Sequence, residues 1–174
     1  MTDPTETASR ARLFLDAGVI IEGCFAAWGA AKAVLILATL RQRFTVVLAE
    51  AIEREVRRAI ATRTAGMDAE HAAAVARGVA GWLDRVRLER VPLPSPDDVR
   101  ALAPVLLPAL RHVNDLPAAV SAVQARPDWV ISSNQEHWTP QLAARTGLRI
   151  VTPRGFRDHL AVPARPASSP PADG

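Results

Sequence analysis

Cysteine, lysine and tyrosine are nearly missing from this sequence of 174 residues. The single cysteine, Cys24, can form no disulfide within the chain and cannot build a cysteine-based zinc site. We expect it to be a small buried apolar residue. There is no tyrosine and there are only four phenylalanines, so the hydrophobic 49% of the chain is mostly Ala, Val and Leu. A chain of this length and alanine content is expected to form one domain rich in helix.

The sequence also lacks the patterns of a secreted or membrane-spanning protein. The amino terminus carries Asp3 and Glu6 instead of a basic start followed by an apolar stretch, so no signal peptide is predicted. The apolar stretch at residues 24–40 is too short for a membrane span and contains Lys32. It is predicted to be a helix buried in the core, and we expect a cytoplasmic protein with no membrane partner.

Short apolar runs alternate with helix-like segments along the chain. Strands are predicted at residues 12–16, 44–48, 85–91, 129–132 and 148–151. Helices are predicted at residues 29–43, 50–62 and 67–83, from residue 97 onward, and at residues 115–124 and 140–146. Strands separated by helices predict an α/β fold, a three-layer α/β/α sandwich around a parallel sheet. This domain is placed at residues 11–160, with residues 1–10 and the Pro-, Ala- and Ser-rich residues 161–174 predicted to be disordered.

Polar residues stand at the carboxyl ends of two predicted strands, where parallel sheets bind ligands, and two further acids stand in or before helices. Asp16 ends the first strand, and Glu55 lies beside the apolar stripe of the helix after the second strand. Asp115 opens a later helix, and Asn134 follows the fourth strand within the sequence SSN. Each has an ordinary explanation when taken alone, since Asp and Asn cap turns and helices and Glu pairs with Arg on solvated helix faces.

Other polar and aromatic residues near these positions are weaker candidates. His137, just after SSN, is interpreted as an ordinary surface or hydrogen-bonded histidine. Trp138 is the one tryptophan considered for stacking on a base, and the others are candidates for the core or an interface. Five arginines could contact phosphates, although most are expected to pair with glutamates on a solvated helix face. These are Arg41, Arg43, Arg54, Arg57 and Arg58.

Four sequence motifs together resemble the PIN domain, whose members include the toxin nucleases of bacterial VapBC-type toxin–antitoxin pairs. The motifs are LFLDAGVII at the first strand, VVLAEAIEREV at the second, NDLPAAVSA before the fourth, and WVISSNQEHW followed by GLRIVTPRGF. The resemblance covers about residues 12–156 and includes a closing TP-x-x-F at Thr152, Pro153 and Phe156. It implies a PIN-like fold and a metal-dependent endoribonuclease.

The resemblance also implies the site residues. Three of the family's acids fall on Asp16, Glu55 and Asp115. The fourth is usually an Asp in a T-x-D loop, and here Asn134 stands at that position, with Glu136 as an alternative acid two residues on. We predict that Asp16, Glu55, Asp115 and Asn134 are catalytic and bind Mg²⁺ or Mn²⁺, which prefer oxygen ligands. One tight metal is expected, with a second that is weaker or arrives with the substrate.

Three functions are compatible with these residues. The first is hydrolysis of RNA by the toxin of a toxin–antitoxin pair, for which the resemblance implies an antitoxin that covers the site and a homodimer. The second is a PIN-like module that binds RNA or protein without cutting it, because Asn134 replaces one carboxylate. The third, a phosphotransfer domain, is disfavoured. Gly18 stands where the phosphatase type has its second Asp, and the receiver type needs a late lysine, whereas none follows Lys32.

Overall fold

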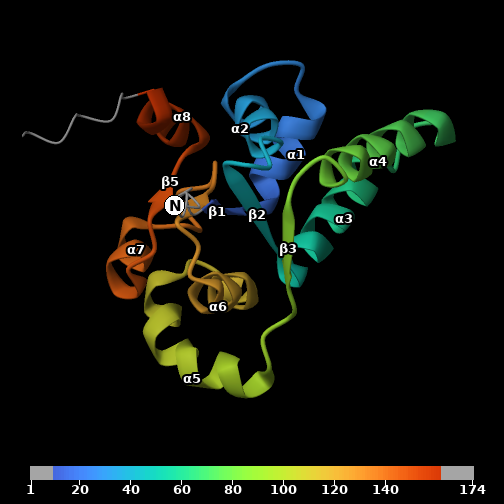
Figure 1. The fold of residues 1–174 in the computed structure, drawn as a ribbon. Coiled ribbons are helices and arrows are strands. Elements are labelled where there is room, and N and C mark those ends of the chain that lie inside the picture. Colours follow the sequence, from blue (N-terminus) through green and yellow to red (C-terminus); the bar gives the residue numbers. More distant parts are fainter. Residues whose placement is uncertain (1–9, 162–174) are drawn as a thin grey trace, which may run out of the picture.

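A parallel sheet of five short strands forms the centre of the structure (Figure 1). The computed structural model describes residues 10–161, and the expectations for residues 1–9 and 162–174 lie outside that range. The strands are β1 (Ala11–Leu15), β2 (Phe44–Ala49), β3 (Leu88–Val91), β4 (Trp129–Ile131) and β5 (Ile150–Val151). Their order is β3-β2-β1-β4-β5, and every neighbouring pair is parallel. The parallel sheet predicted from the sequence is confirmed.

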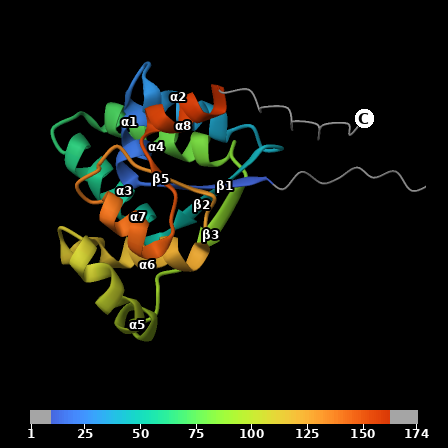
Figure 2. The same ribbon diagram turned by 90° about the vertical axis from the view of Figure 1, so that its left-hand side faces the viewer.

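Helices cover the two faces of this sheet, as Figures 1 and 2 show. One face carries α1, α2, α4 and α8, and the other carries α5, α6 and α7. The remaining helix, α3, lies beside α1 and α6. The bounds in the described part of the chain are α1 (Ala17–Phe25), α2 (Ala30–Ala38), α3 (Glu50–Thr64), α4 (Ala69–Leu83), α5 (Pro96–Leu106), α6 (Leu116–Ala125), α7 (Pro140–Thr146) and α8 (Pro153–Ala161). The three-layer arrangement agrees with the predicted fold class.

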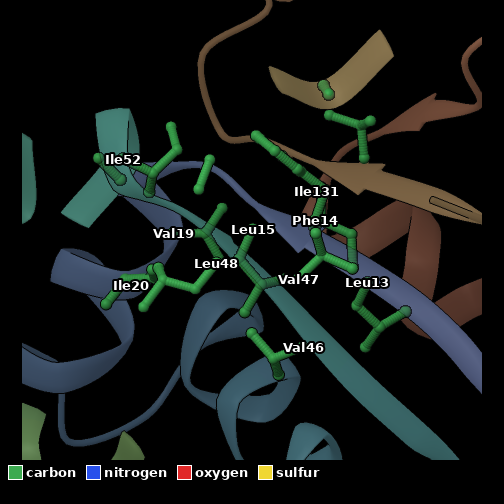
Figure 3. Packing of buried hydrophobic residues seen from close by; sticks show 14 of the residues in the cluster. Leu13, Phe14, Leu15, Val19, Ile20, Val46, Val47, Leu48, Ile52 and Ile131 are labelled. Carbon is green, nitrogen blue, oxygen red and sulfur yellow. The ribbon is translucent and has the colours of Figure 1, made fainter. Parts of the chain in front are cut away.

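The core lies on both sides of the two central strands (Figure 3). Leu13 and Phe14 of β1 and Val46 and Val47 of β2 are all fully buried. Strands that are covered on both faces must be apolar at successive positions, which explains why these runs do not alternate. The same packing holds the carboxyl ends of β1 and β2 in fixed positions, and the candidate site is built at those ends.

The sequence patterns do not predict two of the helices, α1 and α8. The first turns of α1 contain Val19, Ile20 and Ile21 in a row, and such β-branched residues favour strands when judged locally. The helix forms because Asp16 ends β1 and caps the next turn: its side chain accepts a hydrogen bond from the backbone N–H of Ala17. Strand and helix are therefore joined directly at Asp16, which fixes the position of its carboxylate.

The apolar stretch at residues 24–40 is not the single helix expected from the sequence. Helix α1 ends at Phe25, and α2 begins at Ala30 and ends at Ala38 instead of at residue 43. Gly29 separates them with φ of 124°, a conformation that side chains rarely adopt. No single helix between residues 10 and 161 is long and apolar enough to cross a membrane, although α1 and α2 would suffice together by length and composition and are bent by 99°.

Candidate functional site

One small cavity at the carboxyl end of the sheet is lined by all four residues that the sequence predicts for the site. Asp16 follows β1, Glu55 lies in the second turn of α3, Asp115 precedes α6, and Asn134 lies in the loop after β4. The cavity has a volume of about 100 Å³. Residues that are up to 118 positions apart (134 − 16) meet there because parallel strands end at the same edge.

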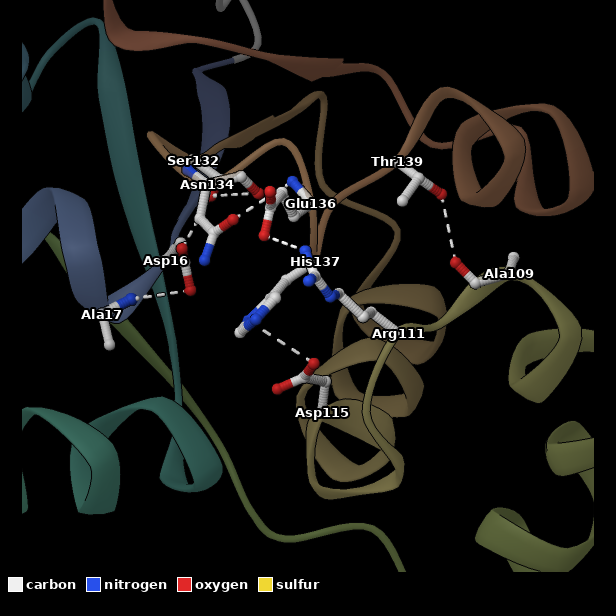
Figure 4. A network of polar contacts seen from close by, with 10 residues as sticks. All are labelled: Asp16, Ala17, Ala109, Arg111, Asp115, Ser132, Asn134, Glu136, His137 and Thr139. Carbon is white, nitrogen blue, oxygen red and sulfur yellow. Dashed lines mark hydrogen bonds and ion pairs between the residues drawn. The ribbon is translucent and has the colours of Figure 1, made fainter.

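Asp16 is buried and held by hydrogen bonds on both carboxylate oxygens (Figure 4). The backbone N–H of Ala17 donates to Oδ1 over 2.9 Å, and Ser132 Oγ donates to Oδ2 over 2.6 Å. Burial raises the pKa of Asp16, and the bond from Ser132 lowers it part of the way back. Asp16 is therefore a rigid carboxylate that carries an energetic cost when it is charged.

Asp115 precedes α6 but does not act as an ordinary helix cap, because its side chain makes no capping hydrogen bond. Its Oδ2 atom is buried, and within residues 10–161 it has no hydrogen-bond partner. His137 Nδ1 lies 3.4 Å from this oxygen, close enough for an ion pair but outside hydrogen-bond geometry. A buried polar atom without a partner is rare in proteins and commonly marks a position that a ligand or ion completes.

Glu55 faces the other two acids. Burial, followed by the negative charges of Asp16 and Asp115, raises the pKa of Glu55. Because Glu55 as a residue remains exposed, solvent screens part of this shift in pKa. Mutual repulsion among three carboxylates is what a cation-binding site shows before the cation binds.

The other glutamates of α3 are engaged elsewhere. They form ion pairs on the outer face of the helix: Glu50 with Arg54, and Glu53 with Arg57 and Arg90. No ion pair of Glu55 occurs in the described part of the chain. Of these glutamates, Glu55 lines the cavity and Glu53 does not.

The loop after β4 is folded by its own polar groups. The backbone N–H of Asn134 donates to Ser132 Oγ over 2.9 Å, and Asn134 Oδ1 accepts from the backbone N–H of Glu136 over 3.1 Å. The Glu136 carboxylate forms an ion pair with Arg111, and Glu136 does not line the cavity (Figure 4). In this arrangement the Glu136 carboxylate therefore lies outside the cavity, and its role as an alternative fourth acid stays a prediction.

His137 belongs to the cavity, unlike the ordinary surface histidine expected from the sequence. Besides its contact with Asp115, its ring packs edge-on against His112 with 5.3 Å between the ring centroids. The signal in the sequence was its position three residues after Asn134 in a loop at the carboxyl end of a strand. Sequence reasoning also missed Ser132 as the group that holds Asp16.

Three other candidates are placed differently from expectation. Trp138 is buried, with its ring centroid 5.7 Å from that of Phe14, so it is not available for stacking on a base. Arg41 and Arg43 lie before β2, at the amino end of the strand, where the Arg43 carbonyl accepts from Ala11. They are on the opposite edge of the sheet from the cavity and cannot contact a phosphate bound there.

The donor atoms of the cavity suit a hard divalent cation, although they do not enclose one in this arrangement. Carboxylate and amide oxygens are the ligands that Mg²⁺ and Mn²⁺ prefer, and Oδ2 of Asp115 lacks a partner. Between residues 10 and 161, however, no three His, Cys, Asp or Glu side chains are close enough to hold one ion. The oxygen atoms of these residues therefore suit a divalent cation, but the side chains are farther apart than ligands of one ion would be.

No protein-family model matches the sequence, and no curated protein matches it. Solved structures with a similar fold do exist. A chain of VapBC2 from Rickettsia felis, bound to a DNA fragment from its promoter, is 13% identical with a TM-score of 0.57, covering 81% of this chain and 98% of that one. PAE2754 from Pyrobaculum aerophilum is 16% identical with a TM-score of 0.58, covering 90% of this chain and 94% of that one.

A third similar structure is FitAcB from Neisseria gonorrhoeae, at 13% identity and a TM-score of 0.51, covering 82% of this chain and 98% of that one. At such identities the likeness establishes the fold and does not extend to the activity. The strand order, the helical layers and these three structures agree with the fold that the sequence motifs imply. The chain therefore has a PIN-like α/β/α fold.

Proposed function

We propose that this protein is a metal-dependent endoribonuclease that hydrolyses RNA phosphodiester bonds, and that it is the toxin of a toxin–antitoxin pair. One observation carries the proposal: Asp16, Glu55, Asp115 and Asn134 line a single cavity at the carboxyl end of the sheet. The similarity in fold to VapBC2 and FitAcB supports it, as does the resemblance of the sequence motifs to PIN-domain toxins.

In this proposal Asp16, Glu55 and Asp115 bind Mg²⁺ or Mn²⁺, and Asn134 offers a neutral oxygen. The bound ion would supply a water of lowered pKa and neutralise charge on the scissile phosphate. The protein's own groups prepare the site. Ser132 fixes the orientation of Asp16, and Oδ2 of Asp115 accepts no hydrogen bond from residues 10–161, with His137 Nδ1 at 3.4 Å as its nearest cationic group.

A second candidate function is a PIN-like module that binds RNA or protein without cutting it. It is favoured by Asn134, whose amide oxygen already accepts a hydrogen bond from Glu136 N–H. An amide oxygen keeps a second lone pair, so this bond weakens Asn134 as a ligand without removing it. The variant Asn134→Asp separates the two functions: a large gain in cleavage would show that the natural site is attenuated.

The antitoxin that covers the site is also proposed to bind an apolar groove of about 410 Å³ between α3 and α4. Most of its lining is aliphatic, with Ile20, Leu48, Val56, Ile60, Val79 and Leu83 among the lining residues. An apolar helix or strand of a partner would bury these side chains, which is the usual basis of helix-in-groove recognition. A homodimer is also proposed, and light scattering would detect it as about twice the chain mass of 18.7 kDa.

The test is cleavage of a labelled single-stranded RNA by the purified chain with Mg²⁺, with Mn²⁺ or with EDTA. We expect cleavage that requires a metal and falls to background in Asp16→Asn. Glu70→Gln, which removes an exposed acid from the first turn of α4, should cleave like the natural protein. Cleavage that persists in EDTA or in Asp16→Asn would contradict the proposal, and so would a folded protein that cuts with neither metal.

A further inference from the structure

A groove of about 420 Å³ lies next to the candidate site and has no part in the chemistry described above. Its walls are the bend between α1 and α2, the start of α2, and the start of α8. Ser133 also lines it, and the next residue, Asn134, lines the acidic cavity. The groove thus continues from the rim of the site along the carboxyl end of the sheet.

Trp28 in this groove is the exposed tryptophan of the described chain. Its relative exposure is 86%, compared with 3% for Trp82 and 6% each for Trp129 and Trp138. Trp28 therefore contributes little to the core, and its flat face is open to a ligand. An indole ring is the side chain on which bases stack most favourably, and stacking is tolerant of sequence because every base has a π face.

The charges around Trp28 favour an anion. Lys32, the only lysine in the chain, lines the groove from α2, and Arg154 lines it from α8 with a side chain that is 80% exposed. Arg154 has only a 3.8 Å contact with Asp158. The single acid of the lining is Glu22, whose carboxylate accepts a hydrogen bond from Ser133 Oγ over 2.7 Å. The two cations outnumber this acid.

The backbone of the groove adds to the positive potential. The nine-residue helices α2 and α8 both begin in its wall, and the amino ends of helices carry partial positive charge. Gly29, the N-cap of α2, makes no side-chain cap, so no side chain of that residue competes for the first amides. These helix ends add to the positive potential of Lys32 and Arg154, whose side-chain charges make the larger contribution.

We propose that this groove binds the single-stranded RNA that flanks the scissile bond, with one base stacked on Trp28 and the backbone phosphates held by Lys32 and Arg154. The proposal rests on the ribonuclease function and names its substrate as single-stranded RNA. Duplex RNA cannot present an unstacked base to Trp28, so it is a poor ligand. Helix α1 has nine residues and is about 14 Å long at 1.5 Å per residue, a length that a short run of nucleotides covers; Asp16 stands directly before it and Trp28 follows its last residue by three positions.

Binding is measured by fluorescence anisotropy with the full chain in EDTA, which prevents metal-dependent cleavage. The probes are a fluorescein-labelled single-stranded oligoribonucleotide and a hairpin duplex of the same composition. Trp28→Ala is expected to weaken binding of the single strand about tenfold, and Trp28→Phe less, because a phenyl ring keeps part of the stacking. Met67→Ala is the matched control, since Met67 is an exposed apolar residue at the distant turn between α3 and α4.

Two further measurements test the same groove. Lys32→Gln should reduce the slope of log K against log salt by about 0.7, the amount expected for one lost phosphate contact on a single strand. Because the other tryptophans are buried, RNA should change mainly the fluorescence of Trp28 and should protect it from a soluble quencher. That protection should be absent in Trp28→Ala.

The outcomes separate this proposal from the ribonuclease function. If the natural protein cleaves RNA with metal and Trp28→Ala binds RNA with unchanged affinity, the proposed role of the groove is wrong and the ribonuclease function stands. Weaker RNA binding in Trp28→Ala together with no cleavage in any metal would support the groove and overturn the nuclease. No detectable binding by the natural protein would overturn the groove. If Trp28→Ala changes the molar mass in solution but not the RNA affinity, the groove is a protein contact and the proposal is wrong.

Discussion

Asp16 and Asp115 each lower the stability of the folded protein at the candidate site, and they do so for different physical reasons. Asp16 is fully hydrogen-bonded but buried, so its charge is expensive. Asp115 has a buried oxygen that makes no hydrogen bond within the described part of the chain, and a lost hydrogen bond of this kind costs about 1–3 kcal/mol. Both costs are explained if a cation binds there.

At the same scale, Ser132 is predicted to matter through Asp16. Ser132→Ala removes the 2.6 Å hydrogen bond to Asp16 Oδ2 and frees the carboxylate to rotate. Groups that orient a metal ligand typically change metal affinity or activity by about 10- to 100-fold, so we expect a loss in that range with the fold intact. The measurement is the Mn²⁺ concentration that gives half-maximal cleavage.

The control for Ser132→Ala is Thr62→Ala, which removes an exposed hydroxyl from α3. It should leave the Mn²⁺ dependence unchanged. If Ser132→Ala instead lowers thermal stability while the surviving folded protein keeps its metal dependence, then Ser132 is only a packing residue and the positioning role is wrong.

At the scale of elements, local sequence signals predict boundaries well where a cap or a break is encoded in one or two residues. The helix predicted at residues 140–146 ends at Gly147, which adopts φ of 71°. Ser95 and Asp98 form a capping box at the start of α5. Helix α1 could not be predicted in this way, because its β-branched residues are accommodated by burial on all sides and not by local preference.

The candidate site shows the same division between local and tertiary information. Asp16 and Asn134 follow predicted strands, so the topology of a parallel sheet suffices to bring them together. Trp138 and Arg41 were placed incorrectly because nearness in sequence says nothing about which side chain is buried or which sheet edge it occupies. The pairing of His137 with Asp115 depends on the path of the loop after β4, which no pattern encodes.

The packing of α1 on α2 leads to a prediction about two glycines. A Cβ on Gly23 would lie 2.6 Å from the Leu35 side chain and 3.0 Å from the Ala31 carbonyl oxygen. Gly23→Ala is therefore expected to destabilise the protein by about 1–3 kcal/mol through overpacking. Gly78→Ala in α4 meets open space, and removing a mid-helix glycine should stabilise by about 0.5–1 kcal/mol. Urea unfolding of both variants measures the two free energies, and equal signs would contradict this account.

At the scale of the whole molecule, the groove and the acidic cavity draw on different faces of the sheet. The groove that holds Trp28 is built by α1, α2 and α8 on one face. The acidic cavity also takes Asp115, which directly precedes α6 on the other face. The site therefore spans the layers at the carboxyl end of the sheet, and its stability is linked to that of the whole sandwich.

This linkage makes global stability depend on pH in a way that can be predicted. The pKa values of Asp16 and Glu55 are raised in the folded protein, so between pH about 4 and their folded pKa values the folded state binds more protons than the unfolded state. The free energy of unfolding contributed by these groups must then fall as pH rises through that window. Carboxylates such as Asp98, whose pKa is lowered, act in the opposite direction and must be subtracted.

The subtraction is made with Asp16→Asn, which cannot titrate at that position. In EDTA, we expect the free energy of unfolding of Asp16→Asn, minus that of the natural protein, to increase from pH 4 to pH 7. Saturating Mg²⁺ at pH 7 should make the natural protein more stable than Asp16→Asn, because a ligand that binds only the folded natural protein stabilises it by mass action. Urea titrations at several pH values, with and without the metal, measure both effects. If the difference between the two free energies of unfolding in EDTA does not change with pH, the pKa of Asp16 is not raised by its burial. If Mg²⁺ stabilises both proteins equally, Asp16 is not a ligand of the metal.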